Sequence, residues 1–267
     1  MAERTLIYPD FTLTSYGHLI AQIATRWQIM RLADAVGGQA GPGSLILRHD
    51  VDFSPALALP MAEIEGELGV RATYFIALHL HYNPHTPLHA HALRRMVTLG
   101  HEIGLHYEGA VYDAAGTPEA QRALLQQHVE VLQDICQAPI ASIARHNPSV
   151  ATGRDPFAVG TPFFNAYDPS LFQNTVYLSD SCRAWRNGGL APCWDKSSPR
   201  IYLLIHPEVW SDRTGIQRLD YLQLLCQQIQ QEQDDFFAEV QAIWEHHAGG
   251  SEHDRRMQNS VDQRASE

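Results

Sequence analysis

The stretch Arg48-His49-Asp50-Val51-Asp52 decides the fold predicted for this chain. It follows the apolar run at 45–47, and Ser54 and Pro55 come after it as the N-cap and the first residue of a helix. An apolar run, an acidic pair and a helix start together indicate the carboxyl end of a buried strand, where parallel α/β folds place their chemistry. Alternate residues of a strand share a face, so we expect the two aspartates to point the same way. Two solvated aspartates on a surface loop are the alternative interpretation.

Predicted strands and helices alternate along the rest of the chain, which is typical of a parallel sheet covered by helices. The length of 267 residues fits one α/β barrel domain or two small domains. We predict further strands at 71–76, 101–106, 140–144, 163–168, 176–180 and 201–206. We predict helical segments at 11–37, 54–68, 93–99, 117–135 and 217–246.

Composition excludes several classes of protein. A formal charge of -11 argues against a nucleic-acid partner, because phosphate contacts need basic patches. No apolar run approaches the roughly 18 residues of a membrane span, and the N-terminus lacks a signal-peptide core. We therefore expect a cytoplasmic protein without a membrane span. Its four cysteines have no C-x-x-C spacing and are interpreted as thiols of a reducing compartment, with a bridge between Cys182 and Cys193 as the alternative.

Side chains that bind metals or move protons recur where the predicted strands end. These residues are Asp50, Asp52, His106, His146, Asp180 and His206. Strand ends of a parallel barrel converge on one mouth, so the set can form a single site. One Asp and two His around Zn²⁺ with an open position would activate water and polarise a carbonyl, which suits hydrolysis of an amide or ester. Taken singly, each histidine is more often a structural residue.

A histidine-rich segment follows the strand at 71–76. An additional metal site is one interpretation, but no paired spacing on a helix face supports it. We interpret the segment as a lid or crossover loop. Its histidines are His79, His81, His85, His89 and His91.

Four segments resemble the motifs of the NodB-type polysaccharide deacetylases, which are metal-dependent enzymes on an incomplete (β/α) barrel. The first is the pentapeptide at 48–52, which is similar to the Asp-x-Asp motif of the family. The others are Ala72-Thr73-Tyr74-Phe75, Gly100-His101-Glu102-Ile103-Gly104-Leu105-His106 and Leu204-Ile205-His206-Pro207. The resemblance spans about residues 45–210. The sequences His-Asp-Val-Asp at 49–52 and His-Pro-Glu-Val-Trp at 206–210 resemble those of bacterial family members found near surface-polysaccharide genes.

The resemblance implies an α/β fold, an incomplete (β/α)7 barrel in a single domain. We expect this domain at 44–248, with a helical segment at 1–43 packed on it. The polar residues at 249–267 are expected to form a disordered tail.

The resemblance also implies roles for the site residues. Asp50 would be the general base, and His206 would be the general acid that protonates the leaving group. Asp52 and His106 would be metal ligands, and the ion would be one divalent cation, zinc in the first instance.

Two departures from the family pattern concern the metal site. The family has another ligand four residues after the first histidine of its second motif, where this chain has Ala110. The third family motif, Arg-x-Pro-Tyr, aligns with His146 at the arginine and Ser149 at the aromatic residue. We therefore predict His146 as the third ligand, with Glu108 as the alternative.

The segment 180–186 stands where the fourth family motif would fall. Asp180 would orient His206, a role that a buried carboxylate commonly takes beside a working histidine. Arg183 and Arg186 would bind a negatively charged group of the substrate, and Trp185 would stack on a sugar ring. A solvated loop with a packed tryptophan is the alternative.

The leading prediction is a metal-dependent hydrolase that removes an N- or O-linked acetyl group from a sugar or sugar derivative. Its substrate would be a small molecule or an oligosaccharide, possibly anionic. One alternative is a metal-dependent hydrolase of another non-peptide amide. The other is a sugar-binding relic of the fold, which the alanine at position 110 favours and the retention of Asp50 and His206 opposes. The sequence leaves the oligomeric state open.

Overall fold

The computed structural model describes residues 10–148, 155, 157, 160–185, 189–195 and 199–248. The chain divides into two compact units, Met1–Gly215 and Ile216–Glu267. The first unit is an α/β domain, and the described part of the second contains helix α9 (Arg218–Ala248), which confirms the helix expected near 217–246. The predicted tail at 249–267 lies outside the described residues.

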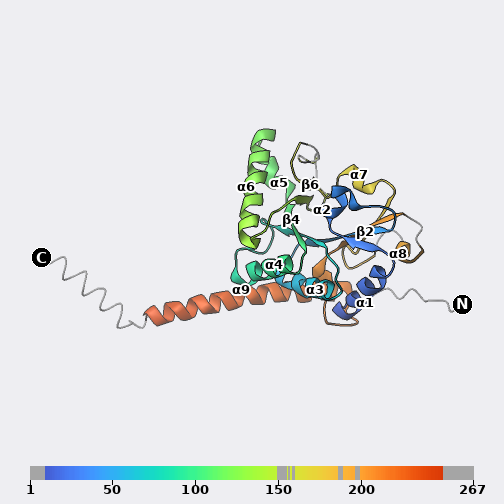
Figure 1. The fold of residues 1–267 in the computed structure, drawn as a ribbon. Coiled ribbons are helices and arrows are strands. Elements are labelled where there is room, and N and C mark those ends of the chain that lie inside the picture. Colours follow the sequence, from blue (N-terminus) through green and yellow to red (C-terminus); the bar gives the residue numbers. More distant parts are fainter. Residues whose placement is uncertain are drawn as a thin grey trace, which may run out of the picture. The chain divides into compact units, whose positions relative to one another are not determined.

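The first unit is built on a curled sheet in which every strand pair is parallel (Figure 1). Seven strands follow one another in the order β6-β5-β4-β3-β2-β8-β7, and β1 pairs with β2 beside this path. The strands are β1 (Gln28–Met30), β2 (Ser44–Val51), β3 (Thr73–Ala77), β4 (Glu102–Tyr107), β5 (Ser142–Arg145), β6 (Phe164–Asn165), β7 (Thr175–Ser179) and β8 (Arg200–Ile205). This arrangement confirms the α/β class and is consistent with an incomplete barrel.

Helices cover the outer face of the sheet, where alternate strand residues are apolar (Figure 1). The helices α1 (Leu13–Ala24), α3 (Pro55–Glu67), α4 (Pro87–Thr98) and α6 (Pro118–Cys136) pack on one another in that order. Ser54 caps α3 as predicted, and Thr117 caps α6. The shorter helices are α2 (Leu32–Asp34), η1 (Ala35–Gln39), α5 (Gly109–Asp113), α7 (Pro169–Phe172), α8 (Pro192–Asp195) and η2 (Pro207–Val209).

The inner face of the curl changes from apolar to polar along the strands. Ile46, Phe75 and Tyr202 belong to a buried cluster inside the curl. Further toward the carboxyl ends the same face carries Asp50 and His106. Alternate residues of a strand point to the same face; Asp50 lies four residues after the inward-facing Ile46, and His106 lies two residues after Gly104, which pairs with the inward-facing Phe75. The fold therefore gathers the polar side chains at one end of the sheet.

Two details of the sequence prediction are wrong. Residues 28–30 were expected to be helical but form the strand β1. This strand pairs with residues 44–46 of β2, and β3 pairs with residues 48–51 of β2. Pairing with β2 therefore overrides the helical spacing of these apolar residues. The helix predicted at 93–99 begins earlier, at Pro87, so His89 and His91 belong to α4 and not to a loop.

A buried carboxylate ties β2 to the helices behind it. Glu65 on α3 accepts hydrogen bonds from the hydroxyl groups of Tyr16 and Tyr74, and its Oε1 lies 2.7 Å from Nε2 of His49. Burial opposes ionisation of Glu65, but the charge of His49 lowers its pKa below the ordinary value. These contacts fix β2, which carries Asp50 and ends one residue before Asp52. Within the residues that the structure describes, no helix is both long and apolar enough to cross a bilayer.

Candidate metal centre

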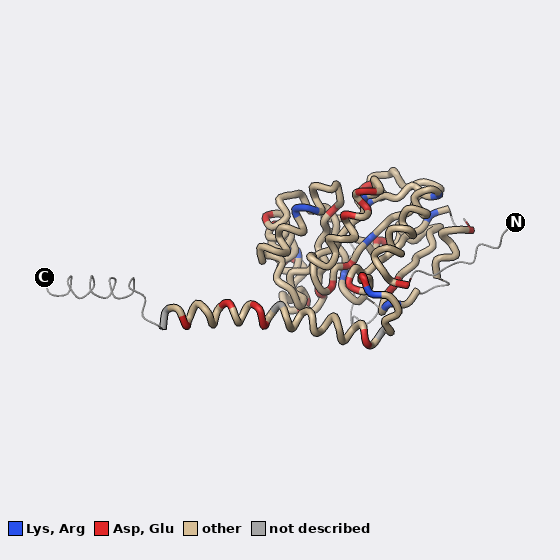
Figure 2. The backbone as a smooth tube through the Cα atoms, turned by 90° about the horizontal axis from the view of Figure 1, so that it is seen from below, with Lys and Arg blue, Asp and Glu red and all other residues tan. Residues whose placement is uncertain are grey.

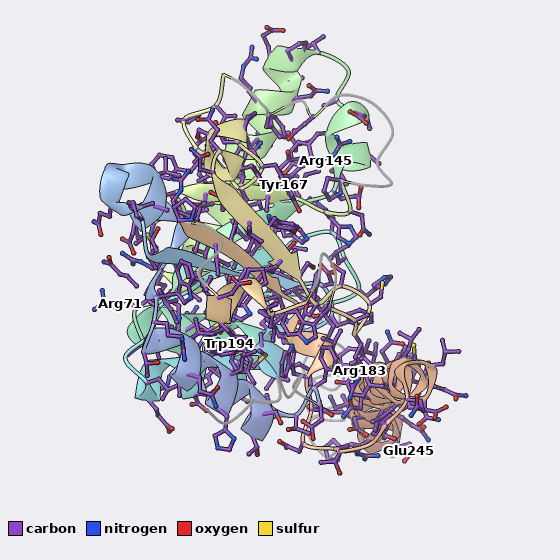
Figure 3. The ribbon with its side chains drawn as sticks, turned by 90° about the vertical axis from the view of Figure 1, so that its right-hand side faces the viewer. Arg71, Arg145, Tyr167, Arg183, Trp194 and Glu245 are labelled. Atoms are coloured by element: carbon purple, nitrogen blue, oxygen red, sulfur yellow. The ribbon has the colours of Figure 1, made fainter. Side chains whose placement is uncertain are left out.

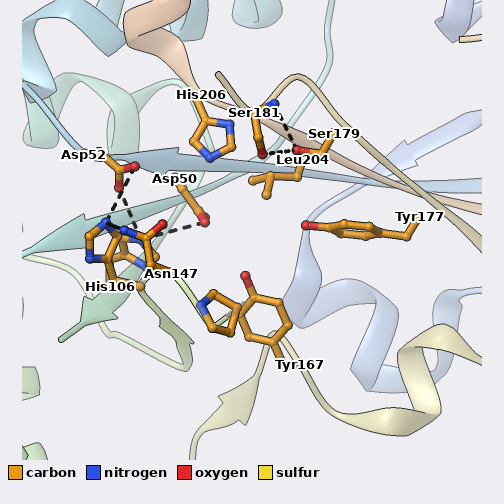
Figure 4. A pocket seen from close by; sticks show the side chains of 12 residues that line it. Asp50, Asp52, His106, Asn147, Tyr167, Tyr177, Ser179, Ser181, Leu204 and His206 are labelled. Carbon is orange, nitrogen blue, oxygen red and sulfur yellow. Dashed lines mark hydrogen bonds and ion pairs between the residues drawn. The ribbon is translucent and has the colours of Figure 1, made fainter. Parts of the chain in front are cut away.

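A cavity of about 280 Å³ lies at the carboxyl ends of the strands (Figure 4). Its walls combine acidic, imidazole and hydroxyl groups with apolar side chains. The lining residues are Asp50, Asp52, His106, His146, Asn147, Pro148, Tyr167, Tyr177, Ser179, Ser181, Leu204 and His206. Five of the six residues that the sequence predicted at strand ends line this cavity, and the sixth, Asp180, lies behind it.

Three of these side chains can hold a metal ion. One ligand atom from each of Asp52, His106 and His146 lies within 4.8 Å of the other two. Nε2 of His106 is 3.3 Å from Oδ1 of Asp52, and Nε2 of His146 is 3.9 Å from Oδ2. His106 lies on β4, where it pairs with Ala77 of β3, and Asp52 directly follows Val51, the last residue of β2, so both ligands lie at the carboxyl ends of the strands that flank β3.

Hydrogen bonds select the ring nitrogen that each histidine offers. Nδ1 of His106 lies 3.0 Å from the carbonyl oxygen of Ala144, and Nδ1 of His146 lies 2.9 Å from Oε2 of Glu108. Because both partners are acceptors, each Nδ1 carries a proton and donates it. In the neutral form, each Nε2 then has its lone pair free for a metal, the tautomer that metal-binding histidines adopt. Asn147 contacts Nε2 of His146 at 2.9 Å and would have to turn away on metal binding.

The charges and donor atoms at this centre are compatible with a bound cation. Burial alone would raise the pKa of Asp52, but its contact with His106 lowers the pKa to about 2. The carboxylates of Asp50 and Asp52 raise the pKa of His106 despite its burial. Oδ1 of Asp52 and Nε2 of His106 are buried without a hydrogen-bond partner among the described residues. One carboxylate and two imidazoles form a donor set that fits zinc, and binding would replace the His106 proton with the ion.

Asp50 is held by an arginine from its own strand. Nε and Nη2 of Arg48 donate to Oδ1 and Oδ2 of Asp50, each at 2.7 Å. The guanidinium contacts the rings of Phe75 and Tyr167, with its central carbon 5.0 and 4.5 Å from their centroids. Burial opposes ionisation of Asp50, but Arg48 lowers its pKa below the ordinary value. Asp50 is therefore an ionised carboxylate, 3.7 Å from Nε2 of His106.

His206 on the opposite side of the cavity is oriented by a fully buried carboxylate. Oδ1 of Asp180 lies 2.8 Å from Nδ1 of His206, and Oδ2 accepts a hydrogen bond from Nε1 of Trp210 at 2.8 Å. Burial alone would lower the pKa of His206, but its bond to Asp180 raises the pKa to about 10. In the metal-free protein, His206 is a proton donor at neutral pH.

Sequence reasoning assigned no role to Arg48 or Glu208. Arg48 was predictable, because residues two apart on a strand face the same way and a cation there can pair with Asp50. Glu208 is buried in η2, and its Oε2 has no hydrogen-bond partner among the described residues. Burial and the nearby charge of Asp52 raise its pKa well above the ordinary value. The burial of Glu208 depends on the turn after β8, which leaves no sequence signal.

Glu108 and the residues proposed for substrate binding lie elsewhere than expected. Glu108 contacts His146 and does not join the group of ligand atoms. Arg183 donates to the carbonyl oxygen of Val209 at 2.9 Å and lies over the ring of Phe11, and Figure 3 shows it away from the cavity residue Tyr167. Trp185 stacks on Phe11. Neither Arg183 nor Trp185 lines the cavity, and Arg186 lies outside the described residues.

No protein-family model matches this chain, and no curated protein matches its sequence.

Proposed function

We propose that this cavity is the active site of a zinc-dependent hydrolase that removes an acetyl group from a sugar or sugar derivative, on a barrel of the NodB type. The observation that carries the proposal is the pair of buried atoms, Oδ1 of Asp52 and Nε2 of His106, that face each other without a hydrogen bond. His146 is oriented toward the same point by Glu108. It would supply the ligand that the resemblance places at Ala110.

Five residues of the cavity would take part in this hydrolysis. Asp52, His106 and His146 would hold zinc, which supplies a Lewis acid for the carbonyl and lowers the pKa of water. Asp50 would take a proton from the attacking water at its carboxylate, and its paired Arg48 keeps that carboxylate ionised at neutral pH. His206 would donate its Nε2 proton to the leaving nitrogen or oxygen, while Asp180 holds the ring by Nδ1.

The lining of the cavity supports a sugar as the substrate. Tyr167, Tyr177, Ser179 and Ser181 bring hydroxyl groups that can exchange hydrogen bonds with a polyol. Among the twelve described lining residues there is no Lys or Arg, so an uncharged sugar fits better than the anionic substrate suggested by Arg183 and Arg186.

Metal content and acetate release test this proposal together. We expect purified protein to carry about one zinc ion per chain and to release acetate from members of a panel of N- and O-acetylated monosaccharides. Asp52→Ala should lower zinc content by at least about tenfold, because it removes a ligand. Asp50→Asn, the matched change at the neighbouring carboxylate, should keep the metal and lose about 100-fold or more of the hydrolysis rate. His206→Ala should behave like Asp50→Asn.

Other outcomes separate the competing functions. Full zinc occupancy in Asp52→Ala would overturn the ligand assignment. Loss of metal in Asp50→Asn would exchange the roles of ligand and base. A wild-type protein that binds zinc and several of the sugars but releases no acetate would be the sugar-binding relic, and the proposal of hydrolysis would be wrong.

A further inference from the structure

Helix α9 carries apolar residues at alternating steps of three and four along most of its 31 residues. The average step of 3.5 residues is the heptad period of coiled coils and differs from the 3.6 of an ordinary amphipathic helix. We call these positions the seam. The seam consists of Leu219, Leu222, Cys226, Ile229, Gln233, Phe236, Val240 and Ile243.

The seam is largely exposed. Of the nine exposed large hydrophobic side chains of the described protein, six lie on α9, and four of these belong to the seam. Leu219 is 74% exposed, Phe236 61% and Ile243 50%. Phe237 and Trp244 flank the seam and are 65% and 72% exposed. An apolar stripe of this length on a surface marks a binding site for another apolar surface.

The charges of α9 argue against a membrane as that surface. Helices that lie on membranes carry Lys and Arg beside their apolar face. After Arg218 the sequence of α9 contains no Lys or Arg, and its acidic residues include Asp220, Asp234, Asp235, Glu239 and Glu245; Figure 2 colours acidic positions along the helix red. An acidic helix with a heptad seam is suited to another helix.

We propose that α9 pairs with α9 of a second copy of this chain in a parallel, two-stranded coiled coil. A helix of 31 residues is about 46 Å long and about 10 Å wide, so pairing would bury on the order of 1,000 Å² in total, which is enough for a specific interface. Parallel pairing in register brings each seam position opposite itself.

Gln233 explains why the partner is an identical helix in parallel. It is the single amide in the otherwise apolar or thiol-bearing seam, and a polar residue at such a position sets register and orientation. Parallel pairing places Gln233 opposite its own copy, where the two amides satisfy each other's hydrogen bonds. The antiparallel alternative with Leu219 opposite Ile243 places Gln233 opposite Ile229, which leaves the amide without a partner.

The oligomeric state of the full chain tests the pairing. Light scattering after size exclusion should give a mass of twice 29.9 kDa for the wild type. The seam variant Phe236→Asp, Ile243→Asp should give a monomer. The matched control, Ala238→Asp, Ala242→Asp, adds the same charge to the same two turns off the seam and should remain a dimer. A monomeric wild type, or a dimeric seam variant, would overturn the proposal.

Circular dichroism shows whether the variants remain folded. The seam variant and its control should retain the thermal transition of the α/β domain, since both changes lie in the second compact unit. If the control variant also became monomeric, dissociation would reflect loss of the helix and the seam would not be the cause, which would overturn the proposal.

Oxidation tests the orientation. Cys226 is an exposed seam residue, so parallel pairing in register brings its thiol opposite the same thiol of the second copy. In a Cys182→Ser background, diamide should take two electrons and two protons from these thiols and form one disulfide per dimer. Cys226→Ser should abolish the cross-linked band. A dimer without cross-linking in the Cys182→Ser protein would show that the helices are not parallel and in register.

Discussion

Asp50 and Arg48 form a buried ion pair on one face of β2. Their two hydrogen bonds and the aromatic rings around the guanidinium compensate for the loss of water around both charges. The same pairing lowers the basicity of Asp50, so the residue gains a fixed position and constant ionisation at the expense of proton affinity. In the proposed hydrolysis, where Asp50 would be the base, a fixed position would matter more than proton affinity.

Removing the charge of Asp50 is expected to destabilise the fold. Asp50→Asn leaves the buried Arg48 without a counter-charge and should lower the free energy of unfolding by about 3 kcal/mol in urea denaturation. The double variant Arg48→Met, Asp50→Asn should lose less than the sum of its single variants, because no uncompensated charge remains. Exposed ion pairs contribute less than about 1 kcal/mol. A loss of unfolding free energy in this range for Asp50→Asn would contradict this interpretation.

Glu108 is expected to act on the metal through His146. Glu108→Ala removes the acceptor of the Nδ1 proton, so His146 can rotate or change tautomer, and zinc affinity should fall by about 10- to 100-fold. Competition with a chromogenic chelator measures this affinity. Asp113→Ala removes an exposed acid from the adjacent helix α5 and is the control. Equal affinities in the two variants would show that Glu108 has no orienting role.

At the scale of elements, the contact between β3 and β4 depends on a missing side chain. Phe75 crosses Gly104, and a Cβ at this glycine would lie 2.4 Å from Cε1 of the ring. Gly104 therefore lets Phe75 pack inside the curl, where the ring also contacts Arg48. The backbone of one strand thus sets the position of the arginine on another.

Gly104→Ala is expected to lower the free energy of unfolding by roughly 1–3 kcal/mol, because the ring or the strand must move. Urea denaturation measures the loss. Gly41→Ala, where a Cβ meets nothing within 4 Å, should have little effect. Combining Gly104→Ala with Phe75→Leu should cost less than the two changes added together. If the two losses in unfolding free energy simply added, the contact between Phe75 and position 104 would not be the cause of the destabilisation.

Elements with a strong local pattern were predictable, and those that depend on a partner were not. The seven strands of the main path were all placed by their apolar runs, and Ser54 was recognised as a helix cap. The strand β1 was missed because its apolar residues fit a helical spacing, and its pairing depends on the half of the β2 edge that β3 leaves unpaired. In the same way, the ring tautomers of His106 and His146 follow from a carbonyl and a carboxylate that spacing alone does not place.

At the scale of the molecule, His206 links the site to the pH dependence of stability. Its pKa of about 10 in the folded metal-free protein exceeds the ordinary value of about 6.5. The contribution of His206 to the free energy of unfolding is therefore complete below about pH 6.5 and is lost as the pH rises toward 10. Over this window the folded state holds a proton that the unfolded state has released.

The free energy of unfolding of the metal-free wild type should accordingly fall between pH 7 and 10 more steeply than that of His206→Gln. The difference in slope is at most about 1.4 kcal/mol per pH unit, the value for one proton. Urea denaturation in the presence of a chelator at several pH values measures both slopes. Parallel profiles for the two proteins would show that His206 titrates alike in the folded and unfolded states.

The order of the strands places one side of the cavity on a central strand and the other side on edge strands, which have fewer hydrogen-bonded neighbours. Asp50 stands on β2, which is paired along both edges, whereas β6 is two residues long and ends the sheet together with β7. Tyr167 follows β6 and Tyr177 lies on β7, so the hydroxyl-bearing wall rests on strands with a single paired neighbour. Amide hydrogens there should exchange with solvent sooner than those of β2. In the proposed reaction, a bulkier sugar would therefore displace an edge strand and leave Asp50, Asp52 and His106 in place.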